Sequence, residues 1–513
     1  MTATSLYGWG DPGQVPELPQ AILDALGVRG PPPRVEIDLP APRLPVAAVQ
    51  ELAAICEIRS DEESRLRRTR GKSTTDLLRM RAGDPVGVPD HIALPASHDE
   101  VLALLRVCSE NGIAVVPFGG GTSVVGGLEP HAETFLALDT QRMDALLELD
   151  EESRTARLQP GLRGPQAEAL LGERGYTIGH FPQSFEYATL GGFAAARSSG
   201  QASAGYGRFD ELVLALEVAT PAGTLSLGRA PKAATGPDLR QLLLGSEGAF
   251  GIITSLTLQI RPAPAVRVYE GWRFASFEDG AASVRRLTQD GPRPTVLRLS
   301  DEAETAIGLA QPGEIGSGGA GSLAIVGFEG AAAEVEERQA AVAGLLKEAG
   351  AEFVPGAGGS WARDRYRGPY LRDALLDAGA LADTLETATF WSSLPALYER
   401  VSSALRDSLA GQGTPPVVLC HLSHVYPAGA SLYFTVACAQ AEDPVAQWRA
   451  AKEAAGQAIL AAGGSISHHH GIGRDHLAFY EREVGPLAID ALRAVKKRLD
   501  PAGILNPGIL LPS

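Results

Sequence analysis

The segment Pro117-Phe-Gly-Gly-Gly-Thr-Ser-Val-Val-Gly-Gly127 constrains the fold of this chain more than any other. A helix predicted over 99–111 and a short apolar strand predicted over 113–118 lead into it. Three consecutive glycines leave the backbone bare, so that several N–H groups can turn inward and press against an anion. A second glycine-rich stretch, Gly245-Ser-Glu-Gly-Ala-Phe-Gly251, lies far away in the sequence. Together the two stretches predict one large diphosphate cofactor that is held from several sides.

The size and charge of the chain exclude several classes of protein. With 513 residues, it is too long for one ordinary core and is expected to form two or three domains. The formal net charge of −16 argues against nucleic acid as a partner, because phosphate backbones repel an anionic surface. No run of about 18 apolar residues occurs, so we expect no membrane-spanning helix.

The cysteines and the first residues favour a reducing compartment. Four cysteines stand far apart with no Cys-x-x-Cys pair, namely Cys56, Cys108, Cys420 and Cys438. This spacing excludes an iron–sulfur centre or a zinc knuckle and favours buried thiols. The opening Met-Thr-Ala-Thr-Ser lacks the basic-then-apolar pattern of a signal peptide. We therefore expect a cytoplasmic protein.

Changes in composition divide the chain into four parts. Residues 1–85 are rich in proline and arginine and predict an irregular, partly helical arm. Residues 86–264 mix strands with helices and end at Arg261-Pro-Ala-Pro264, a proline-rich boundary. Residues 265–443 predict a second domain of strands and helices, and residues 444–513 predict a mainly helical segment.

Local signals favour an α+β fold in both domains. Ser97 and Glu100 form a capping-box pattern at the start of the helix predicted over 99–111, and Gly112 fits its C-terminal cap. Beyond residue 265, strand–helix–strand units recur. Two strands predicted over 417–425 and 430–438 are separated by a short turn, which predicts an antiparallel sheet.

Two common nucleotide-binding motifs do not fit the glycine-rich segment. Gly119-Gly-Gly121 continues into β-branched residues, whereas a Rossmann fingerprint needs Gly-x-Gly-x-x-Gly at the start of a helix. Gly71-Lys72-Ser73 lacks the earlier glycine of a Walker loop. A single glycine-rich stretch would usually be a tight surface turn. Here further segments fit the same task, over 179–192, 196–207 and 245–251.

In order and spacing, segments 117–127, 179–207 and 245–262 resemble the FAD-binding domain of the vanillyl-alcohol oxidase (PCMH-type) flavoprotein superfamily. The resemblance implies an α+β fold, with a two-subdomain FAD-binding domain, a cap domain that has a mainly antiparallel sheet, and a helical C-terminal segment. Several members attach the flavin to a histidine where this chain has Gly121, so noncovalent FAD is implied. The residues implied to bind it are Pro117, Phe118, Gly119, Gly120, Gly121, Thr122, Ser123, Gln183, Ser184, Thr189, Arg197, Ser198, Ser199, Glu247, Gly248 and Gly251.

The triplet in Ser467-His-His-His-Gly471 is the strongest candidate for acid–base chemistry, because histidine titrates near neutrality, at about 6.5. If the segment is extended, His468 and His470 share one face and His469 points the other way. A metal site formed by His468, His470 and His476 is an alternative. It ranks lower because no carboxylate pair or second histidine pair is near in sequence. A surface histidine cluster is a weaker alternative, and we predict no metal.

Two more candidates lie in the second domain. Arg372, in an arginine-rich stretch, could hold a phosphate or carboxylate, although such a stretch is more often a solvated helix end. Tyr433 lies in a predicted strand and is equally well explained as a packed core tyrosine.

Across residues 50–513 the chain resembles the alkyldihydroxyacetonephosphate synthase branch of the superfamily. The matching pieces are residues 179–184, Tyr370-Leu-Arg-Asp373, Leu385-Glu-Thr387, Ser431-Leu-Tyr-Phe434 and Ser467-His-His-His-Gly-Ile-Gly473. The triple histidine stands where the hydroxy-acid dehydrogenase branch has Glu-His-Gly. The resemblance implies that Tyr433 and His469 form the catalytic acid–base pair, flanked by His468 and His470. It also implies that Arg372 binds the substrate phosphate, with Thr384 nearby, and that Arg298 supports the site.

The implied reaction is redox-neutral. The acyl group of acyl-dihydroxyacetone phosphate is exchanged for a long-chain alcohol through a flavin N5 adduct, which forms an ether bond. Departures from the branch at 70–73, Thr384 and Asn506-Pro-Gly508 leave the substrate open. One alternative is an FAD-linked dehydrogenase or oxidase of a 2-hydroxy acid or alcohol, and another is a flavin-binding protein without activity. We expect a lipid-like phosphorylated substrate and a homodimer. Arg65–Lys72 is a candidate for contact with a membrane surface.

Overall fold

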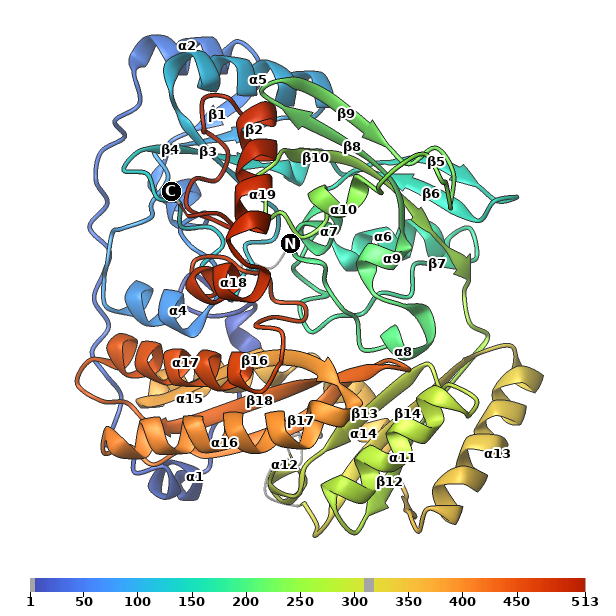
Figure 1. Ribbon diagram of the computed structural model, residues 1–513. Helices are drawn as coiled ribbons and strands as arrows, with labels where there is room; N and C mark the ends of the chain where they lie inside the picture. The colour runs from blue at the N-terminus through green and yellow to red at the C-terminus, as the bar shows by residue number, and fades with distance from the viewer. Residues whose placement is uncertain (1–4, 309–317, 513) are drawn as a thin grey trace.

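The architecture is described by a computed structural model that covers residues 5–308 and 318–512. Figure 1 shows the predicted FAD-binding domain above a second domain built around one broad sheet. We call the second domain the cap domain. The α+β class predicted from the sequence is confirmed, because both domains combine sheets with covering helices.

The first subdomain of the FAD-binding domain carries the glycine-rich segment at a strand end. Its sheet has the order β1-β2-β4-β3, in which β2, β4 and β3 run parallel. The strands are β1 (Glu57–Arg59), β2 (His91–Leu94), β3 (Ala114–Phe118) and β4 (Phe135–Asp139), and the helices are α2 (Val46–Ala53), α3 (Glu62–Leu66) and α5 (His98–Asn111). Helix α4 (Thr74–Arg81), from the same part of the chain, buries Leu77 and Leu78 in the core of the cap domain. As predicted, the Ser97 side chain caps α5 by accepting from the N–H of Glu100, and Gly112 ends it with φ 62°. Strand β3 stops at Phe118, so the glycines follow directly at the carboxyl end of a parallel strand.

The second subdomain is an antiparallel sheet of order β5-β6-β10-β8-β9. Its strands are β5 (Leu146–Asp150), β6 (Thr155–Leu158), β8 (Val213–Thr220), β9 (Gly223–Leu227) and β10 (Ile252–Gln259). Its helices are α6 (Gly164–Gly172), α7 (Leu190–Ala196), α8 (Ser203–Tyr206), α9 (Phe209–Leu212) and α10 (Arg240–Leu243). Short strands β7 (Tyr176–Thr177) and β11 (Arg261–Pro262) pair where the chain leaves for the cap domain.

The cap domain is built on a fully antiparallel sheet of order β15-β12-β14-β13-β17-β18-β16. Its strands are β12 (Val266–Phe274), β13 (Val296–Ser300), β14 (Ser322–Gly330), β15 (Glu352–Val354), β16 (Ala380–Phe390), β17 (Val417–Val425) and β18 (Gly429–Ala439). Its helices are α11 (Phe277–Gln289), α12 (Glu302–Ile307), α13 (Ala332–Glu348), α14 (Ala357–Asp364), α15 (Gly368–Ala378) and α16 (Leu394–Gly411). The predicted antiparallel pair over 417–438 is the central hairpin β17–β18.

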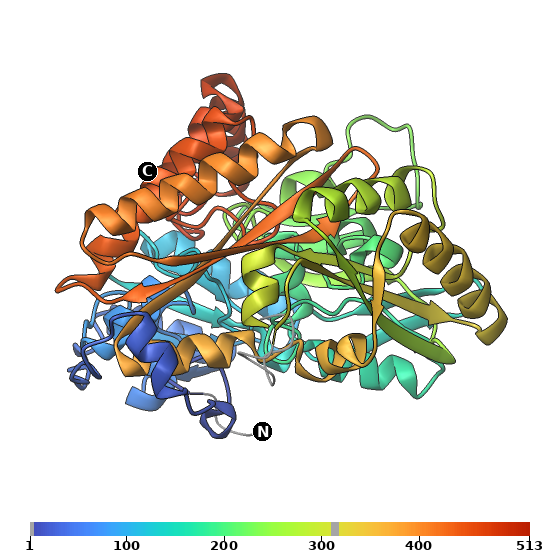
Figure 2. The ribbon, with the colours of Figure 1, turned by 90° about the horizontal axis from the view of Figure 1, so that it is seen from below.

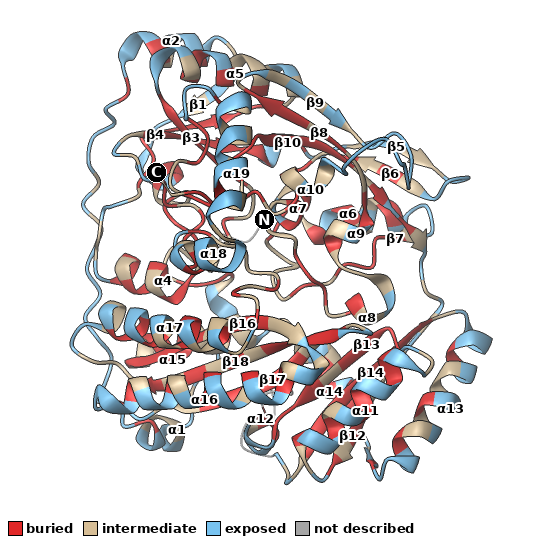
Figure 3. Cartoon of the chain, in the orientation of Figure 1, coloured by how far each residue is buried: buried red, intermediate tan, exposed pale blue. Residues whose placement is uncertain are grey.

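Helices cover both faces of the cap sheet. Seen from below in Figure 2, α11, α13 and α16 lie on one side, whereas α14 and α15 lie on the other. Helices α11, α13 and α16 bury apolar side chains against the sheet, and these form one hydrophobic core with side chains of the sheet itself. Figure 3 shows the result as buried strands with helices that expose only their outer faces.

The two ends of the chain are shared between the domains. Helix α1 (Gln20–Ala25) packs on the cap domain near Leu375, whereas α2 and β1 join the FAD-binding domain. Helix α17 (Pro444–Ala461) lies on the cap domain and α19 (Pro486–Leu499) lies against the FAD-binding domain, as Figure 1 shows. Helix α18 (Leu477–Val484) lies between them, with Phe479 in the cap core and Tyr480 against the core of the FAD-binding domain. Residues 444–513 therefore belong to both domains, because the apolar faces of α17 and α19 have different partners.

Two expectations about membranes can be compared with the structure. Within residues 5–308 and 318–512, no helix has the length and apolar character needed to span a bilayer. The basic stretch proposed for membrane contact is not an exposed patch, since Arg65 and Arg70 are only 3% and 2% exposed. The Arg65 guanidinium donates to the carbonyls of Pro89 and Pro40, so it holds neighbouring chain segments together.

Candidate functional site

One cavity of about 400 Å³ lies between the two domains and is lined by both. The FAD-binding domain contributes its glycine-rich loops, and the cap domain contributes β13, β16, β17, β18, α14 and α15. Most of the predicted site residues therefore face one space, although they are spread over more than 300 positions of the sequence.

The first glycine-rich loop presents bare backbone to this cavity. All residues from Pro117 to Ser123 line it. A Cβ on Gly120 would lie 2.0 Å from the carbonyl oxygen of Tyr187, and one on Gly119 would lie 2.3 Å from Oγ1 of Thr189. Gly121 adopts φ +67°, which L side chains rarely adopt. The packing thus excludes side chains from the loop, and the exposed backbone fits a diphosphate group.

The other predicted cofactor residues meet the first loop across the cavity. Those that line it are Gln183, Ser184, Thr189, Ser198, Ser199, Glu247, Gly248 and Gly251. The amide nitrogen of Gln183 is buried and lacks a hydrogen-bond partner among the described residues, so it is free to bind a ligand group. Arg197 is the exception, because its guanidinium donates to the carbonyls of Leu244 and Gln241, away from the cavity.

A tail residue joins two of the glycine-rich loops. The Nδ2 atom of Asn506 donates to the carbonyl of Gly127, at 3.1 Å, and to that of Glu247, at 2.7 Å. Asn506 is only 1% exposed. The C-terminal tail therefore fixes the distance between the first and third loops. Sequence analysis named Asn506 only as a departure from the family pattern and assigned it no role, since its partners are far away in the chain.

Residues His468–Gly473 form a strap between the domains, held by one buried carboxylate from each. Glu386 of β16 accepts from the backbone N–H groups of His468, His469 and His470, at 2.7, 3.0 and 2.9 Å. Glu247 of the FAD-binding domain accepts from Ile472 and Gly473, both at 2.9 Å. The segment is not extended at the histidines, so the alternation expected for an extended strand does not apply; the backbone bends around the Glu386 carboxylate.

The pKa values of the two carboxylates are shifted in opposite directions. Burial would raise the pKa of Glu386, but the facing His469 and its neighbours hold that pKa well below its usual value. Burial raises the pKa of Glu247 to about 7, against the effect of its backbone donors Gly473 and Ile472. Glu386 had no role assigned from sequence. The signal in the sequence that could have identified Glu386 was an acidic residue in the middle of a mostly buried strand.

Strand pairing places the proposed acid–base residues side by side. Tyr433 of β18 is directly opposite Glu386 of β16 on one side and His421 of β17 on the other. Directly opposed residues share one face of a sheet. The Tyr433 hydroxyl donates to Oγ1 of Thr384 at 2.9 Å, and burial raises the pKa of Tyr433 to about 12. The ring of His469 stacks on that of Tyr433 at a centroid distance of 6.3 Å.

The flanking histidines have different positions. His470 lines the cavity, and burial lowers its pKa to about 3. His468 does not line it; its Nε2 lies 2.7 Å from the Tyr426 hydroxyl, and burial lowers its pKa well below its usual value. The alternative metal grouping of His468, His470 and His476 is not among the groups that the described residues form, and Nδ1 of His476 lies 3.1 Å from the carbonyl of Gly471.

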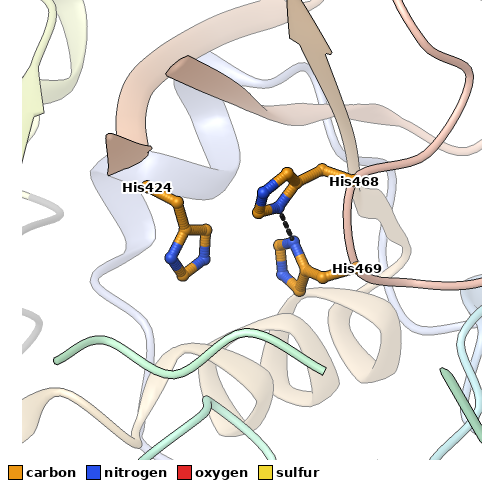
Figure 4. A group of neighbouring side chains, drawn as sticks. All are labelled: His424, His468 and His469. Carbon is orange, nitrogen blue, oxygen red and sulfur yellow. Dashed lines mark hydrogen bonds between the residues drawn. The ribbon is translucent and has the colours of Figure 1, made fainter. Parts of the chain in front are cut away.

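A different trio of histidines converges beside Tyr433. It consists of His424, His468 and His469, and Figure 4 shows their three rings facing one another. His424 shares the face of His421 because a bulge between Leu422 and His424 adds one residue to β17. Without that bulge His424 would point to the opposite face. The sequence carries no readable signal for the bulge, which is why His424 was missed.

Both arginines predicted for the substrate site line the cavity. Arg372 of α15 donates from Nη1 to the Lys72 carbonyl at 2.7 Å, and its buried Nε has no acceptor among the described residues. Arg298 of β13 forms an ion pair with the buried Glu304, and its Nη2 lies 3.2 Å from Nδ1 of His421. The Nε of Arg298 is likewise buried without an acceptor among the described residues, but its guanidinium is paired with Glu304 and orients His421, the neighbour of Tyr433. The Arg372 guanidinium also lies 3.5 Å from Asp373, and its Nε remains as a donor for an anion.

The N-terminal arm also contributes to the cavity wall. Trp9 lines the cavity and is only 5% exposed. Its backbone N–H donates to Asp373, and its ring packs edge-on against Tyr187 at 6.2 Å. The Tyr187 hydroxyl in turn lies 2.7 Å from that of Tyr370 on α15. A proline-rich arm gave no reason to expect a site residue there.

Comparison with known proteins agrees with this geometry. Residues 89–227 match a family model described as an FAD binding domain, and residues 263–510 match one described as the C-terminal domain of FAD linked oxidases. Alkyldihydroxyacetonephosphate synthase of Trypanosoma brucei brucei is 35% identical over 504 residues, which are 93% of this chain and 82% of that protein.

Solved structures extend the comparison to the fold. A structure of alkyldihydroxyacetonephosphate synthase superposes with a TM-score of 0.82 at 30% identity and covers 98% of both chains. A structure of p-cresol methylhydroxylase with substrate bound has a TM-score of 0.67 at 15% identity and covers 91% of this chain and 96% of that one. The fold class that the resemblance implied, a PCMH-type FAD-binding domain with an α+β cap domain, is confirmed.

Proposed function

The chain belongs to the alkyldihydroxyacetonephosphate synthase family and has FAD as its cofactor, and on that premise we propose that it makes an ether bond. In the proposed reaction, acyl-dihydroxyacetone phosphate loses its acyl group as a fatty acid and takes up a long-chain alcohol. An acyloxy group on the three-carbon unit is thus replaced by an alkoxy group, with no net oxidation.

The observation that supports this proposal most is the position of Arg372 relative to the acid–base pair. All three side chains, Arg372, Tyr433 and His469, line the same cavity as the diphosphate-binding loop. The free Nε of Arg372 gives the guanidinium a donor edge for the substrate phosphate. A phosphate bound there would leave the three-carbon unit to extend toward Tyr433 and His469.

The protein residues have separate tasks in the proposed reaction. Bound FAD supplies a nucleophilic ring nitrogen that allows the exchange to be redox-neutral. His469 and Tyr433 move protons at the substrate carbon that carries the acyl group. Thr384 accepts from the Tyr433 hydroxyl and so directs it. His468, His470 and Arg298 maintain the position of this pair.

Proton transfer by positioned side chains contributes ~10²–10⁴-fold to a rate. We expect His469→Ala to bind FAD as tightly as the wild type and to lose turnover by at least this factor, because the glycine-rich loops that hold FAD are untouched. FAD content by absorbance and release of fatty acid by chromatography measure the two effects. Activity within a few fold of the wild type would remove His469 as the base.

A substrate screen distinguishes the proposed reaction from flavin-linked oxidation. Acyl-dihydroxyacetone phosphate and hexadecanol are supplied under anaerobic conditions, while the flavin bands are recorded. We expect ether product and free fatty acid in equal amounts, with the flavin oxidised at the end. Lasting loss of the flavin bands with a 2-hydroxy acid or alcohol, and no ether product, would instead identify a dehydrogenase.

A further inference from the structure

Three imidazole rings converge at the seam between the cap domain and the strap, next to the proposed acid–base pair (Figure 4). One ring nitrogen of His424, one of His468 and one of His469 all lie within 4.8 Å of one another. The proposed reaction uses only His469 of these three for proton transfer. His468 has only a positioning role there and His424 has no role, so the convergence of all three rings needs a separate explanation.

Two of the rings are oriented from behind by hydroxyl groups. Nδ1 of His424 lies 3.0 Å from Oγ of Ser199 and 2.8 Å from Oγ of Ser203. Nε2 of His468 lies 2.7 Å from the hydroxyl of Tyr426. In metal sites, the second nitrogen of a ligating histidine is held in the same way by a hydrogen-bond partner, which fixes the ring and its tautomer.

The spacing of the remaining nitrogens approaches that of metal ligands. Nδ1 of His468 and Nδ1 of His469 lie 3.0 Å apart. Two imidazole nitrogens bound to one tetrahedral Zn²⁺ are about 3.4 Å apart, given bonds of about 2.0–2.1 Å. Among the described residues, none hydrogen-bonds Nε2 of His424, so this nitrogen is available as the third donor.

The donor type selects the kind of ion. Three imidazoles suit Zn²⁺, Co²⁺, Ni²⁺ or Cu²⁺, whereas Mg²⁺ and Ca²⁺ prefer oxygen ligands. The nearest carboxylate, that of Glu386, is 3.5 Å from Nδ1 of His469 and is occupied by the backbone N–H groups of the strap. His424 and His469 both line the cavity, so an ion can reach them and keep one position open toward it.

We propose that His424, His468 and His469 form a binding site for one Zn²⁺ or a similar divalent transition-metal ion, and that occupancy of the site inhibits the enzyme. Inhibition follows because a metal-bound His469 has lost a nitrogen for proton transfer and is fixed in place. This second half rests on the proposed function, whereas binding itself does not.

Binding is measured without any substrate. The FAD-loaded enzyme is freed of trace metals with a chelator and titrated with Co²⁺, which gives ligand-field bands at longer wavelengths than the flavin. We expect one Co²⁺ per chain, displaced by Zn²⁺ but not by Mg²⁺. Absence of such bands, or displacement by Mg²⁺, would overturn the site.

Variants locate the ion. His424→Asn removes one ligand, and we expect the Co²⁺ affinity to fall at least about 100-fold; Tyr426→Phe removes only the partner behind His468, and the expected loss is about tenfold. His98→Asn is the matched control, because His98 binds Thr254 and Thr224 far from the strap. An unchanged flavin spectrum shows that each variant is folded. Equal Co²⁺ affinity in His424→Asn and His98→Asn would refute the assignment.

Inhibition is tested on its own. In the ether-forming assay, Zn²⁺ should inhibit the wild type, with recovery upon addition of chelator, and Tyr426→Phe should need about ten times more Zn²⁺. One bound Co²⁺ together with activity that Zn²⁺ does not affect would overturn the inhibitory role alone. One bound Co²⁺ in a protein that forms no ether product would count against the proposed function and in favour of the metal site.

Discussion

At the scale of single residues, the first glycine-rich loop leaves almost no room for a side chain at its glycines. A methyl group on Gly120 would lie 2.0 Å from the Tyr187 carbonyl, which is backbone and cannot move aside easily. Gly172, in α6, has nothing within 4 Å of the same position. Substituting alanine at each of these two glycines therefore distinguishes the effect of a steric clash from the effect of replacing a glycine as such.

We expect Gly120→Ala to displace the loop and lower the affinity for FAD at least tenfold, which is about 1.4 kcal/mol. Gly172→Ala should bind FAD like the wild type, since its methyl group points into open space. The ratio of flavin to protein absorbance after dialysis measures both. Full retention of FAD by Gly120→Ala would show that this loop does not hold the cofactor.

His180 is a residue whose environment sets a pH dependence of stability. Burial lowers its pKa to about 3; its ring packs between Phe193 and Phe209, and Nε2 lies 3.1 Å from Oγ of Ser198. The folded protein thus keeps this ring neutral, whereas the unfolded chain takes up a proton below about pH 6.5. The stability that His180 contributes is complete above that pH and is lost as the pH falls toward 3.

The expected slope is one proton, or about 1.4 kcal/mol per pH unit below pH 6.5. His180→Gln keeps a polar group near Ser198 but does not titrate, so the fall in melting temperature between pH 7 and pH 5 should be smaller than in the wild type. Thermal melts of both proteins with FAD bound, at several pH values, measure the difference. Parallel pH curves would contradict the assignment.

At the scale of elements, the strap depends on one residue of β16. Glu386 accepts from three consecutive backbone N–H groups and from the Ser467 hydroxyl at 2.9 Å. A glutamine there would place an NH₂ group against N–H donors, and buried donors without acceptors are costly. The strap would then lose the bend that brings His469 beside Tyr433.

We expect Glu386→Gln to retain FAD and to lower kcat at least about 100-fold, because a small misplacement of a catalytic group has effects of this size. Glu483→Gln is the control, since the hydrogen bond that Glu483 forms among the described residues is to the N–H of Ile466, before the strap begins. Flavin content and turnover are measured for both. Near-normal kcat in Glu386→Gln would show that the strap does not need this carboxylate.

The secondary-structure elements also show which features could be predicted from the sequence and which could not. The helix over 99–111 and the hairpin over 417–438 were predicted because capping residues and apolar runs are local signals. The bulge that turns His424 and the bend around Glu386 were not, since both arise from partners in distant strands. Arg197 was misjudged for the same reason: its guanidinium binds the carbonyls of Leu244 and Gln241 instead of facing the cavity.

At the scale of the whole molecule, the C-terminal tail returns to the first strands of the FAD-binding domain. Leu505 forms a bridge with Val115 of β3, and Asn506 ties the loops at Gly127 and Glu247 together. The tail is thus part of the cofactor site, although nearly 380 positions separate its residues from the first loop.

We expect Asn506→Ala to weaken FAD binding by about 1–3 kcal/mol, the cost of leaving buried carbonyls without a donor. Turnover at saturating FAD should stay close to that of the wild type, because Tyr433, His469 and Arg372 are untouched. FAD dissociation constants and kcat at high FAD measure these two effects. A large loss of kcat at saturating FAD would mean that the tail acts on the reaction and not on cofactor binding.

The strap has a consequence for how reactants enter and leave. Its two anchoring carboxylates, Glu386 and Glu247, stand on opposite domains, and both are engaged with the strap backbone within six residues of each other. Moving the two domains apart as rigid bodies would break at least one of these anchorages. The strap therefore opposes hinge opening, and we expect the substrates of the proposed reaction to enter and leave while the histidines stay in place.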